Sequence, residues 1–154
     1  MLARIQTLYL LLASLLASAS MFFPFWSFSS DQIFIISDFG AARIADVTYT
    51  IACFAGTAFS PLTAVLSLAA VFLYKNRTLQ TTLILGAIAL FALDLFSGLA
   101  ASHFMNRHFL AAGTIVTHAP GAGLYIMLPE PLLLFLGLKG VKKDEKIATA
   151  YKRL

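Results

Sequence analysis

The sequence predicts an all-α membrane protein, a bundle of four transmembrane helices with both termini in the cytoplasm. The chain is 60% hydrophobic and only 12% charged, with a mean hydropathy of +0.86, whereas soluble domains are about 45–50% apolar and about 25% charged. Its apolar residues also fall into four runs, each close to the roughly 20 residues that cross a bilayer. We expect one domain with spans at residues 5–25, 49–74, 81–102 and 121–138, followed by a basic cytoplasmic tail at 139–154.

The first apolar run allows two interpretations. Ala17-Ser18-Ala19 has the small-x-small form of a signal-peptidase site, and the apolar stretch before it suits a signal peptide. However, the run continues past that site into Phe22, Phe23, Phe25 and Trp26, a cluster typical of a helix anchored at the membrane interface. We therefore expect a retained first helix, with cleavage after Ala19 as the alternative.

The stretches between the spans predict two outer loops and one tight turn. Residues 27–47 form the first outer loop, where the β-branched sequence Ile33-Phe34-Ile35-Ile36 before Gly40 favours a small β-hairpin. Residues 103–120 form the second outer loop. Lys75-Asn76-Arg77 makes a polar, basic turn between the second and third spans.

Small residues and prolines indicate where helices approach closely or break. Gly56 and Ser60 stand four residues apart in the second span, and Gly98 shares a face of the third span with Asp94, so these positions are predicted to pack against other helices. Prolines lack the backbone N–H that a helix needs, so they predict helix breaks. The sequence places them inside two spans, at Pro61, Pro129 and Pro131.

The distribution of Lys and Arg predicts the orientation. Nine of the 11 lie on one side of the four spans, at Arg4, Lys75, Arg77, Lys139, Lys142, Lys143, Lys146, Lys152 and Arg153. Only Arg43 and Arg107 lie on the other side. The positive-inside rule then places both termini in the cytoplasm, as in a multi-pass protein of the bacterial inner membrane.

The tail lysines indicate a contact with the membrane surface. Lys139, Lys142, Lys143 and Lys146 follow the last span directly, where anionic lipid headgroups attract positive charge. The alternative is a solvated tail that merely ends the last span.

Both ends of the chain resemble a family of small bacterial inner-membrane proteins built on a domain of unknown function. The start Arg4-Ile5-Gln6-Thr7 matches the family's basic-Ile-Gln opening, and Val141 to Lys146 (VKKDEK), followed more loosely by Lys152-Arg153-Leu154, matches its tail. The resemblance implies four spans and an inner-membrane location. It implies no activity and no catalytic residues, and Glu130 is not part of the family's pattern.

Two intramembrane acids, Asp94 and Glu130, are the main candidates for chemistry. A charge at bilayer depth costs about 2.5–3.5 kcal/mol, so such groups face inward and find partners. Both acids lie at similar depth on helices joined by a short loop, where two close carboxyls favour retention of one proton. One interpretation is a site for a proton or cation. The other is structural: a neutral acid hydrogen-bonds to the carbonyls of Tyr125 and Met127, which Pro129 and Pro131 leave free.

The remaining polar residues give weaker signals. His103, His108 and His118 lie on one side of the membrane, but their spacing matches no metal-binding motif, so they are weak metal candidates. Cys53 is the single cysteine, which excludes an intramolecular disulfide. No sequence pattern for a cofactor, a phosphate loop or a catalytic nucleophile is present, and no cofactor is predicted.

These observations predict a non-enzymatic protein of accessory or scaffolding type. Its partners are the lipid bilayer and either other membrane subunits or further copies of itself, because helix faces make up most of its surface. Nucleic acid is excluded as a partner by where the charges lie. The alternative function is a small transporter or a protein that handles protons or cations through Asp94 and Glu130.

Overall fold

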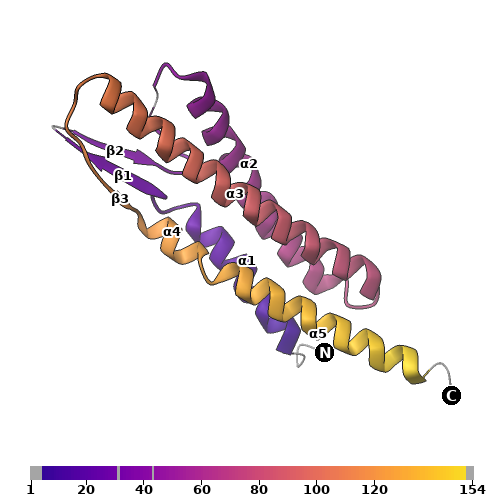
Figure 1. Cartoon of the computed structure of the whole chain (residues 1–154). Helices are drawn as coiled ribbons and strands as arrows, with labels where there is room; N and C mark the ends of the chain where they lie inside the picture. The colour runs from indigo at the N-terminus through magenta and orange to yellow at the C-terminus, as the bar shows by residue number, and fades with distance from the viewer. Residues whose placement is uncertain (1–4, 31, 43, 152–154) are drawn as a thin grey trace.

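A computed structural model describes residues 5–30, 32–42 and 44–151 (Figure 1). Its helices are α1 (Ile5–Ser20), α2 (Val47–Phe72), α3 (Arg77–Ala111), α4 (Ala122–Met127) and α5 (Glu130–Tyr151). The helix α1 packs against α2 and α5, and α3 packs against the same two helices, so the four long helices close into a ring. The predictions on Arg4, Arg43, Lys152, Arg153 and Leu154 lie outside the described residues.

Three helical segments among the described residues are long and apolar enough to cross a membrane. They are Val47–Phe72, Arg77–Ala111 and Ala122–Thr149, the last of which combines α4 with most of α5. The helix α1 is apolar but has 16 residues, or about 24 Å at about 1.5 Å per residue. The chain therefore has the helices of a multi-pass membrane protein, with α1 as a shorter apolar helix in the same bundle.

Two helices end at different places from those expected. The helix α1 ends at Ser20 rather than near Phe25, because proline at position 24 disfavours helix before it and the Phe25 N–H donates to the Ile36 carbonyl at 2.7 Å. The helix α3 continues beyond residue 102 to Ala111, and Gly113, in the left-handed region with φ of 68°, follows its end. As a result, His103 and His108 lie on a helix and not in a loop.

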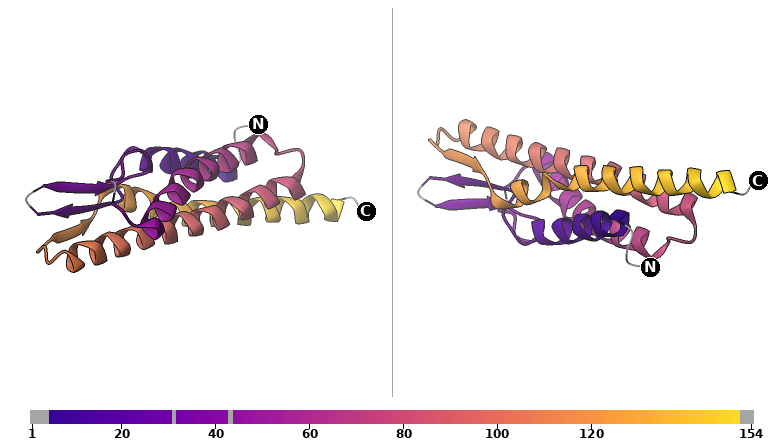
Figure 2. Two further views of the ribbon diagram at one scale, coloured as in Figure 1. Left: turned by 90° about the horizontal axis from the view of Figure 1, so that it is seen from above. Right: turned by 90° about the horizontal axis from the view of Figure 1, so that it is seen from below.

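A small antiparallel sheet covers one end of the bundle (Figure 2). Its strands β1 (Trp26–Ser29), β2 (Ile33–Ile36) and β3 (Thr117–Pro120) have the order β2-β1-β3, with Trp26 opposite both Ile36 and Pro120. The predicted hairpin in the first loop is confirmed, although its two strands meet between Ser29 and Ile33 and not around Gly40. The third strand, which comes from the second loop, was not predicted. We call this end of the molecule the sheet end.

The two loops are also joined by a close backbone crossing. The Gly121 N–H donates to the Phe25 carbonyl at 2.8 Å, and the Gly123 N–H donates to the Pro24 carbonyl at 2.9 Å. A methyl group on Gly121 would overlap the Pro24 carbonyl oxygen, and one on Gly123 would lie 2.7 Å from the Phe23 carbonyl oxygen. Glycine is needed at both positions because the chain passes directly over them.

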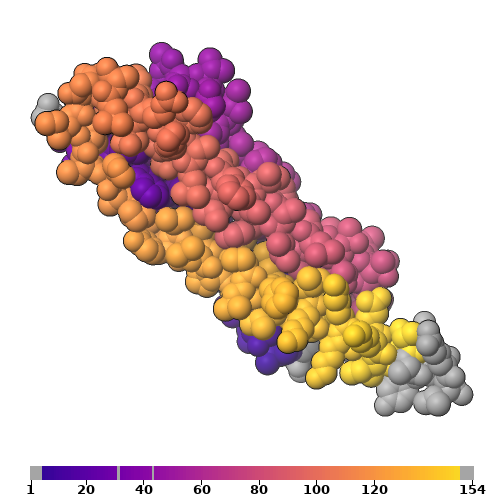
Figure 3. Space-filling view, in the orientation of Figure 1, coloured from indigo at the N-terminus to yellow at the C-terminus, as the bar shows by residue number. Residues whose placement is uncertain are grey.

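The opposite end of the bundle, which we call the basic end, carries the chain termini and the α2–α3 turn (Figure 1). There Asp144 of α5 accepts hydrogen bonds from Gln6 of α1 at 3.2 Å and from Arg77 of α3 at 3.1 Å. The molecule is elongated, and the last turns of α5 project beyond the other helices (Figure 3). One carboxylate thus ties three helices together where the bundle ends.

Candidate functional site

The site begins with a loop that folds back onto α2. The chain leaves β2 at Ile36 and enters α2 at Val47, where the Asp46 carboxylate caps the helix by accepting from the Tyr49 N–H at 2.9 Å. The Tyr49 hydroxyl donates to the Ala42 carbonyl at 2.6 Å, and the Thr57 hydroxyl donates to the Asp38 carbonyl at 2.7 Å. These bonds hold the loop against the helix and direct the Asp38 side chain inward.

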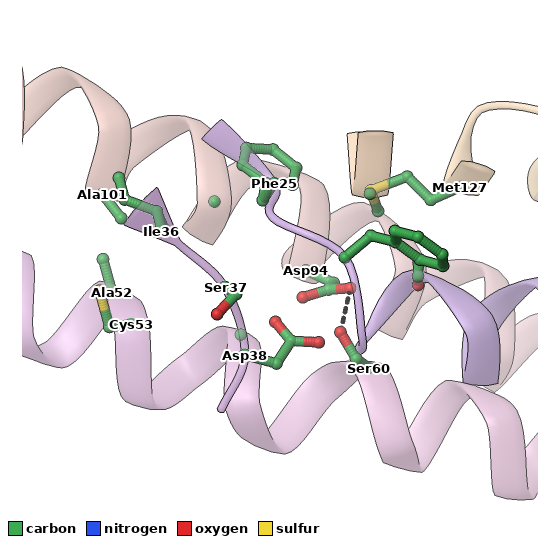
Figure 4. Close-up of a pocket in the computed structure, with 15 residues that line it drawn as sticks. Phe25, Ile36, Ser37, Asp38, Ala52, Cys53, Ser60, Asp94, Ala101 and Met127 are labelled. Carbon is green, nitrogen blue, oxygen red and sulfur yellow. Dashed lines mark hydrogen bonds between the residues drawn. The ribbon is translucent and has the colours of Figure 1, made fainter. Parts of the chain in front are cut away.

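Asp38 meets Asp94 between α2 and α3 (Figure 4). The Ser60 hydroxyl of α2 donates to Asp94 Oδ2 at 2.7 Å, and the side chains of Asp38, Ser60 and Asp94 point toward one another. We call these three residues the carboxyl cluster. The charge-assisted bond from Ser60 fixes the orientation of the Asp94 carboxyl.

Gly56 provides the space in which the two carboxyls converge. A Cβ atom on Gly56 would lie 3.5 Å from Asp94 Oδ1 and 3.6 Å from Asp38 Oδ1. Both oxygens therefore lie beside the α2 backbone at Gly56, where no side chain projects. Two carboxylates this close and partly removed from water repel each other, so the arrangement favours holding a proton between them.

A small cavity adjoins the carboxyl cluster. Its volume is about 30 Å³, and its walls include all three cluster residues together with Cys53, Gly56 and Gly98. A space of this size holds about one water molecule, and the polar walls offer that molecule hydrogen-bond partners. The carboxyl cluster therefore borders a space large enough for a water molecule.

Burial raises the pKa of the Asp38 carboxyl above its ordinary value, and the neighbouring Ser60 hydroxyl lowers it by a smaller amount. Desolvation is the larger cause because the loop presses Asp38 against α2, away from bulk water. The neutral form of Asp38 is thus favoured in the folded protein relative to the unfolded chain.

Glu130 lies at the first position of α5, within electrostatic range of Asp94. Its side chain is only 2% exposed, and within the described residues its Oε1 atom has no hydrogen-bond partner. It is not among the residues that line the small cavity. The structure thus places both predicted acids inside the bundle, with Asp38 as the nearer partner of Asp94.

Comparison with known proteins identifies the family of this chain. The family described as Domain of unknown function (DUF4293) matches residues 2–154. The chain belongs to the DUF4293 family. Membership confirms the resemblance at the level of a family of unknown function, and it adds no site residue. No curated protein and no solved structure matched the chain.

The prolines and glycines singled out in this DUF4293 protein lie in different settings. The helical run is interrupted at Leu128 and Pro129, between α4 and α5, and Glu130 and Pro131 begin α5. Pro61 lies inside α2, which the structure assigns as one helix. A Cβ atom on Gly98 would lie 2.7 Å from the Phe25 ring. Gly98 therefore accommodates an aromatic side chain from the segment before β1, and not another helix backbone.

The three histidines do not come together as a metal site. His103 and His108 are exposed on α3, whereas His118 in β3 packs its ring against those of Trp26 and Phe28 at 6.0 and 5.6 Å. In the part of the chain that the structure describes, no group of three or more His, Cys, Asp or Glu side chains is arranged to hold a metal ion.

The tail lysines continue α5 at the basic end, with Lys139, Lys142, Lys143 and Lys146 all exposed. Arg77 and Lys143 line an open hollow of about 530 Å³ between α1 and α5. Their exposure at one end of an apolar bundle is the arrangement in which lysines reach lipid headgroups.

Sequence reasoning missed Asp38 as a site residue. It was placed in a surface loop, because nothing in its spacing relates it to a helix face. One signal was present: Asp38 comes two residues after a β-prone stretch in a loop short enough to stay against the bundle. What the sequence did not reveal is that the Thr57 and Tyr49 hydroxyls hold this loop on α2.

Proposed function

We propose that this protein crosses the bacterial inner membrane four times, with the basic end in the cytoplasm and the sheet end outside. Lys75, Arg77 and the four tail lysines at the basic end support that orientation. Retention of α1 is supported by its packing, since Leu10 and Ala13 are fully buried and Leu10 lies against Gly137 of α5. Removal of α1 would expose that face of the core.

Reporter fusions test the topology. A reporter that is active only in the cytoplasm should work after Leu154, and one that is active only when exported should work near Asn106. The opposite pattern would overturn the orientation, and an N-terminus at Ser20 in the purified protein would show cleavage after Ala19.

Within this topology, we propose that the protein binds and releases a proton at Asp94. The observation that carries the proposal is the convergence of the Asp94 and Asp38 carboxyls over Gly56, beside a cavity the size of one water molecule. Ser60 donates to Asp94 Oδ2 and holds that carboxyl in place, while Asp38 provides a second oxygen for the proton. Such paired acids inside a bundle occur in proton relays. No catalysed reaction is part of the proposal.

Carbodiimide labelling tests whether Asp94 holds a titrating proton. The carboxyl O–H adds across a C=N bond of dicyclohexylcarbodiimide, and the adduct rearranges to a stable N-acylurea, so the whole reagent stays attached and no group leaves. Mass spectrometry of the digested protein then locates the adduct. We expect Asp94 to be labelled, and the labelling to fall as the pH of the buffer rises and the proton is lost.

The same digest contains the controls. Asp46 caps α2 and Glu145 lies among the tail lysines of α5, so both should stay unlabelled by this apolar reagent. Asp94→Asn should remove the adduct at position 94 and leave unfolding in detergent close to that of the wild type. Labelling of Asp94 that does not change with pH would show a permanently neutral, structural carboxyl and would refute proton exchange.

An accessory role is the second candidate, and one observation favours it. The described residues outside the helices form little more than the small sheet, while the helix faces carry large exposed apolar side chains such as Phe54, Phe96 and Phe135. Partner contacts would therefore form through helix faces within the bilayer. Purification in a mild detergent after cross-linking, followed by identification of the attached proteins, tests this role. A protein recovered alone and monomeric would argue against it.

A further inference from the structure

A groove connects the carboxyl cluster with the surface of the molecule. It lies between the loop residues 38–42 and 44 and the first turns of α2, and has a volume of about 710 Å³. Thr50 and Phe54 line it on the helix side, and Ala42 lines it on the loop side. It opens at the sheet end, which the proposed topology places outside the membrane.

Two residues belong to both the groove and the small cavity. Asp38 and Cys53 line each of them, so they form the partition between the open groove and the buried space beside Asp94. On the groove side the partition is polar, since the Thr57 hydroxyl donates to the Asp38 carbonyl. On the cavity side it faces Ser60 and Asp94 (Figure 4). The Asp38 carboxyl thus lies between the groove and Asp94.

A second buried acid lies within electrostatic range of Asp94. Glu130 at the start of α5 is 2% exposed, and its Oε1 has no hydrogen-bond partner within the described chain. A buried oxygen without a partner costs free energy unless a proton or a water molecule reaches it. The titratable groups that share the cavity with Asp94 are Asp38 from the loop and Cys53 from α2, and Glu130 of α5 lies within electrostatic range.

We propose that protons reach Asp94 from the outer side of the membrane, through the groove that Ala42, Thr50 and Phe54 line, and by way of Asp38. This inference rests on the proposed proton binding at Asp94 and adds the direction of access. Asp38 takes a proton from water in the groove and passes it to Asp94 across the space that Gly56 leaves open. Its negative charge, when ionised, also attracts cations into the groove.

The native Cys53 thiol is a probe of this route. A methanethiosulfonate reagent forms a disulfide with the thiolate and releases methanesulfinate, and a charged version does not cross the bilayer. In sealed vesicles of known orientation, we expect Cys53 to react from the outer side only. A cationic reagent should react several-fold faster than an anionic one, and Asp38→Asn should remove that preference. Reaction from the inner side alone, or from neither side, would overturn the route.

A matched pair of variants tests whether the groove is the path. Thr50 lines the groove and Thr48, two residues earlier on α2, is exposed away from it. Thr50→Trp should slow the reaction of Cys53 several-fold, whereas Thr48→Trp should leave the rate unchanged. Equal rates for the two variants would show that the reagent enters elsewhere.

Carbodiimide labelling with separate inner and outer buffers distinguishes failure of the outer route from failure of proton binding at Asp94. Asp94 labelling in proteoliposomes should follow the pH of the outer buffer. If it follows the pH of the inner buffer, proton binding stands and the outer route is wrong. If it follows neither, proton binding at Asp94 fails and the route fails with it.

Discussion

Two glycine-to-alanine substitutions should differ sharply in their effect on stability. Gly121 lies under the Pro24 carbonyl, which a methyl group would overlap. That segment cannot move aside easily, because hydrogen bonds of 2.7 and 2.8 Å join Phe25 to Ile36 and to Gly121. Overpacking costs about 1–3 kcal/mol, and each lost hydrogen bond costs about 1 kcal/mol more. We therefore expect Gly121→Ala to lower the free energy of unfolding by about 2–4 kcal/mol.

Gly56→Ala is the matched control. Its methyl group would lie no closer than 3.5 Å to any neighbouring atom, which is ordinary contact, and alanine favours an α-helix over glycine by about 1 kcal/mol. The variant should unfold at or above the wild-type denaturant concentration. Unfolding in mixed detergent micelles, followed by circular dichroism, measures both variants. A Gly121→Ala protein as stable as the wild type, or a Gly56→Ala protein that is much weaker, would refute the packing described above.

Three further predictions concern charged groups. Burial raises the pKa of Asp38, so the folded state tolerates the neutral carboxyl better than the ionised one, and stability is lost as pH rises through the folded-state pKa. The melting temperature of Asp38→Asn should therefore rise relative to that of the wild type as pH increases. A difference that stays constant with pH would contradict this. Glu130→Leu should unfold no more easily than the wild type in chemical denaturation, because the buried Oε1 has no hydrogen-bond partner within the described chain. A loss of about 1 kcal/mol or more, the size of one hydrogen bond, would contradict this. Arg77→Ala should cost less than about 1 kcal/mol, because its ion pair with Asp144 is partly exposed, and the cost should shrink when thermal unfolding is repeated in high salt.

The helices of this protein were predictable because their determinants are local. An apolar run of membrane length needs no tertiary information, and Asn76 before Arg77 marks the start of α3 by accepting a hydrogen bond from the Leu79 N–H. Where helices end depends more on what lies nearby. The helix α1 stops at Ser20 because Pro24 and Phe25 are drawn into the sheet. The helix α3 extends to Ala111 because its last turns pack under that sheet, where Phe109 contacts Phe28 at 5.8 Å.

The third strand of the sheet could not be predicted from the sequence of its own loop. Ile33–Ile36 has the β-branched residues of a strand, and a hairpin was predicted there. Thr117–Pro120 has little strand propensity and contains a proline. It pairs with β1 because the Gly121 and Gly123 N–H groups bind the chain just before β1 and bring the two loops side by side. The register of β3 is thus fixed by backbone contacts between residues almost one hundred positions apart, which periodicity does not reveal.

The carboxyl cluster depends both on local helix periodicity and on contacts between distant segments. Asp94 was predicted to face the bundle because helical periodicity places it beside small residues, and the structure does place it between α2 and α3. Its nearest acidic partner depends on the loop: Asp38 reaches Asp94 only because Thr57 and Tyr49 use their hydroxyl groups to hold loop carbonyls on α2. Gly56 then has a role that its spacing with Ser60 did not indicate. A methyl group there would meet Asp94 and Ser97 of α3 at 3.5 Å and Asp38 at 3.6 Å, so Gly56 faces the neighbouring helix and the loop carboxyl together. A row of small residues in a membrane helix can therefore mark a polar site as well as a helix contact.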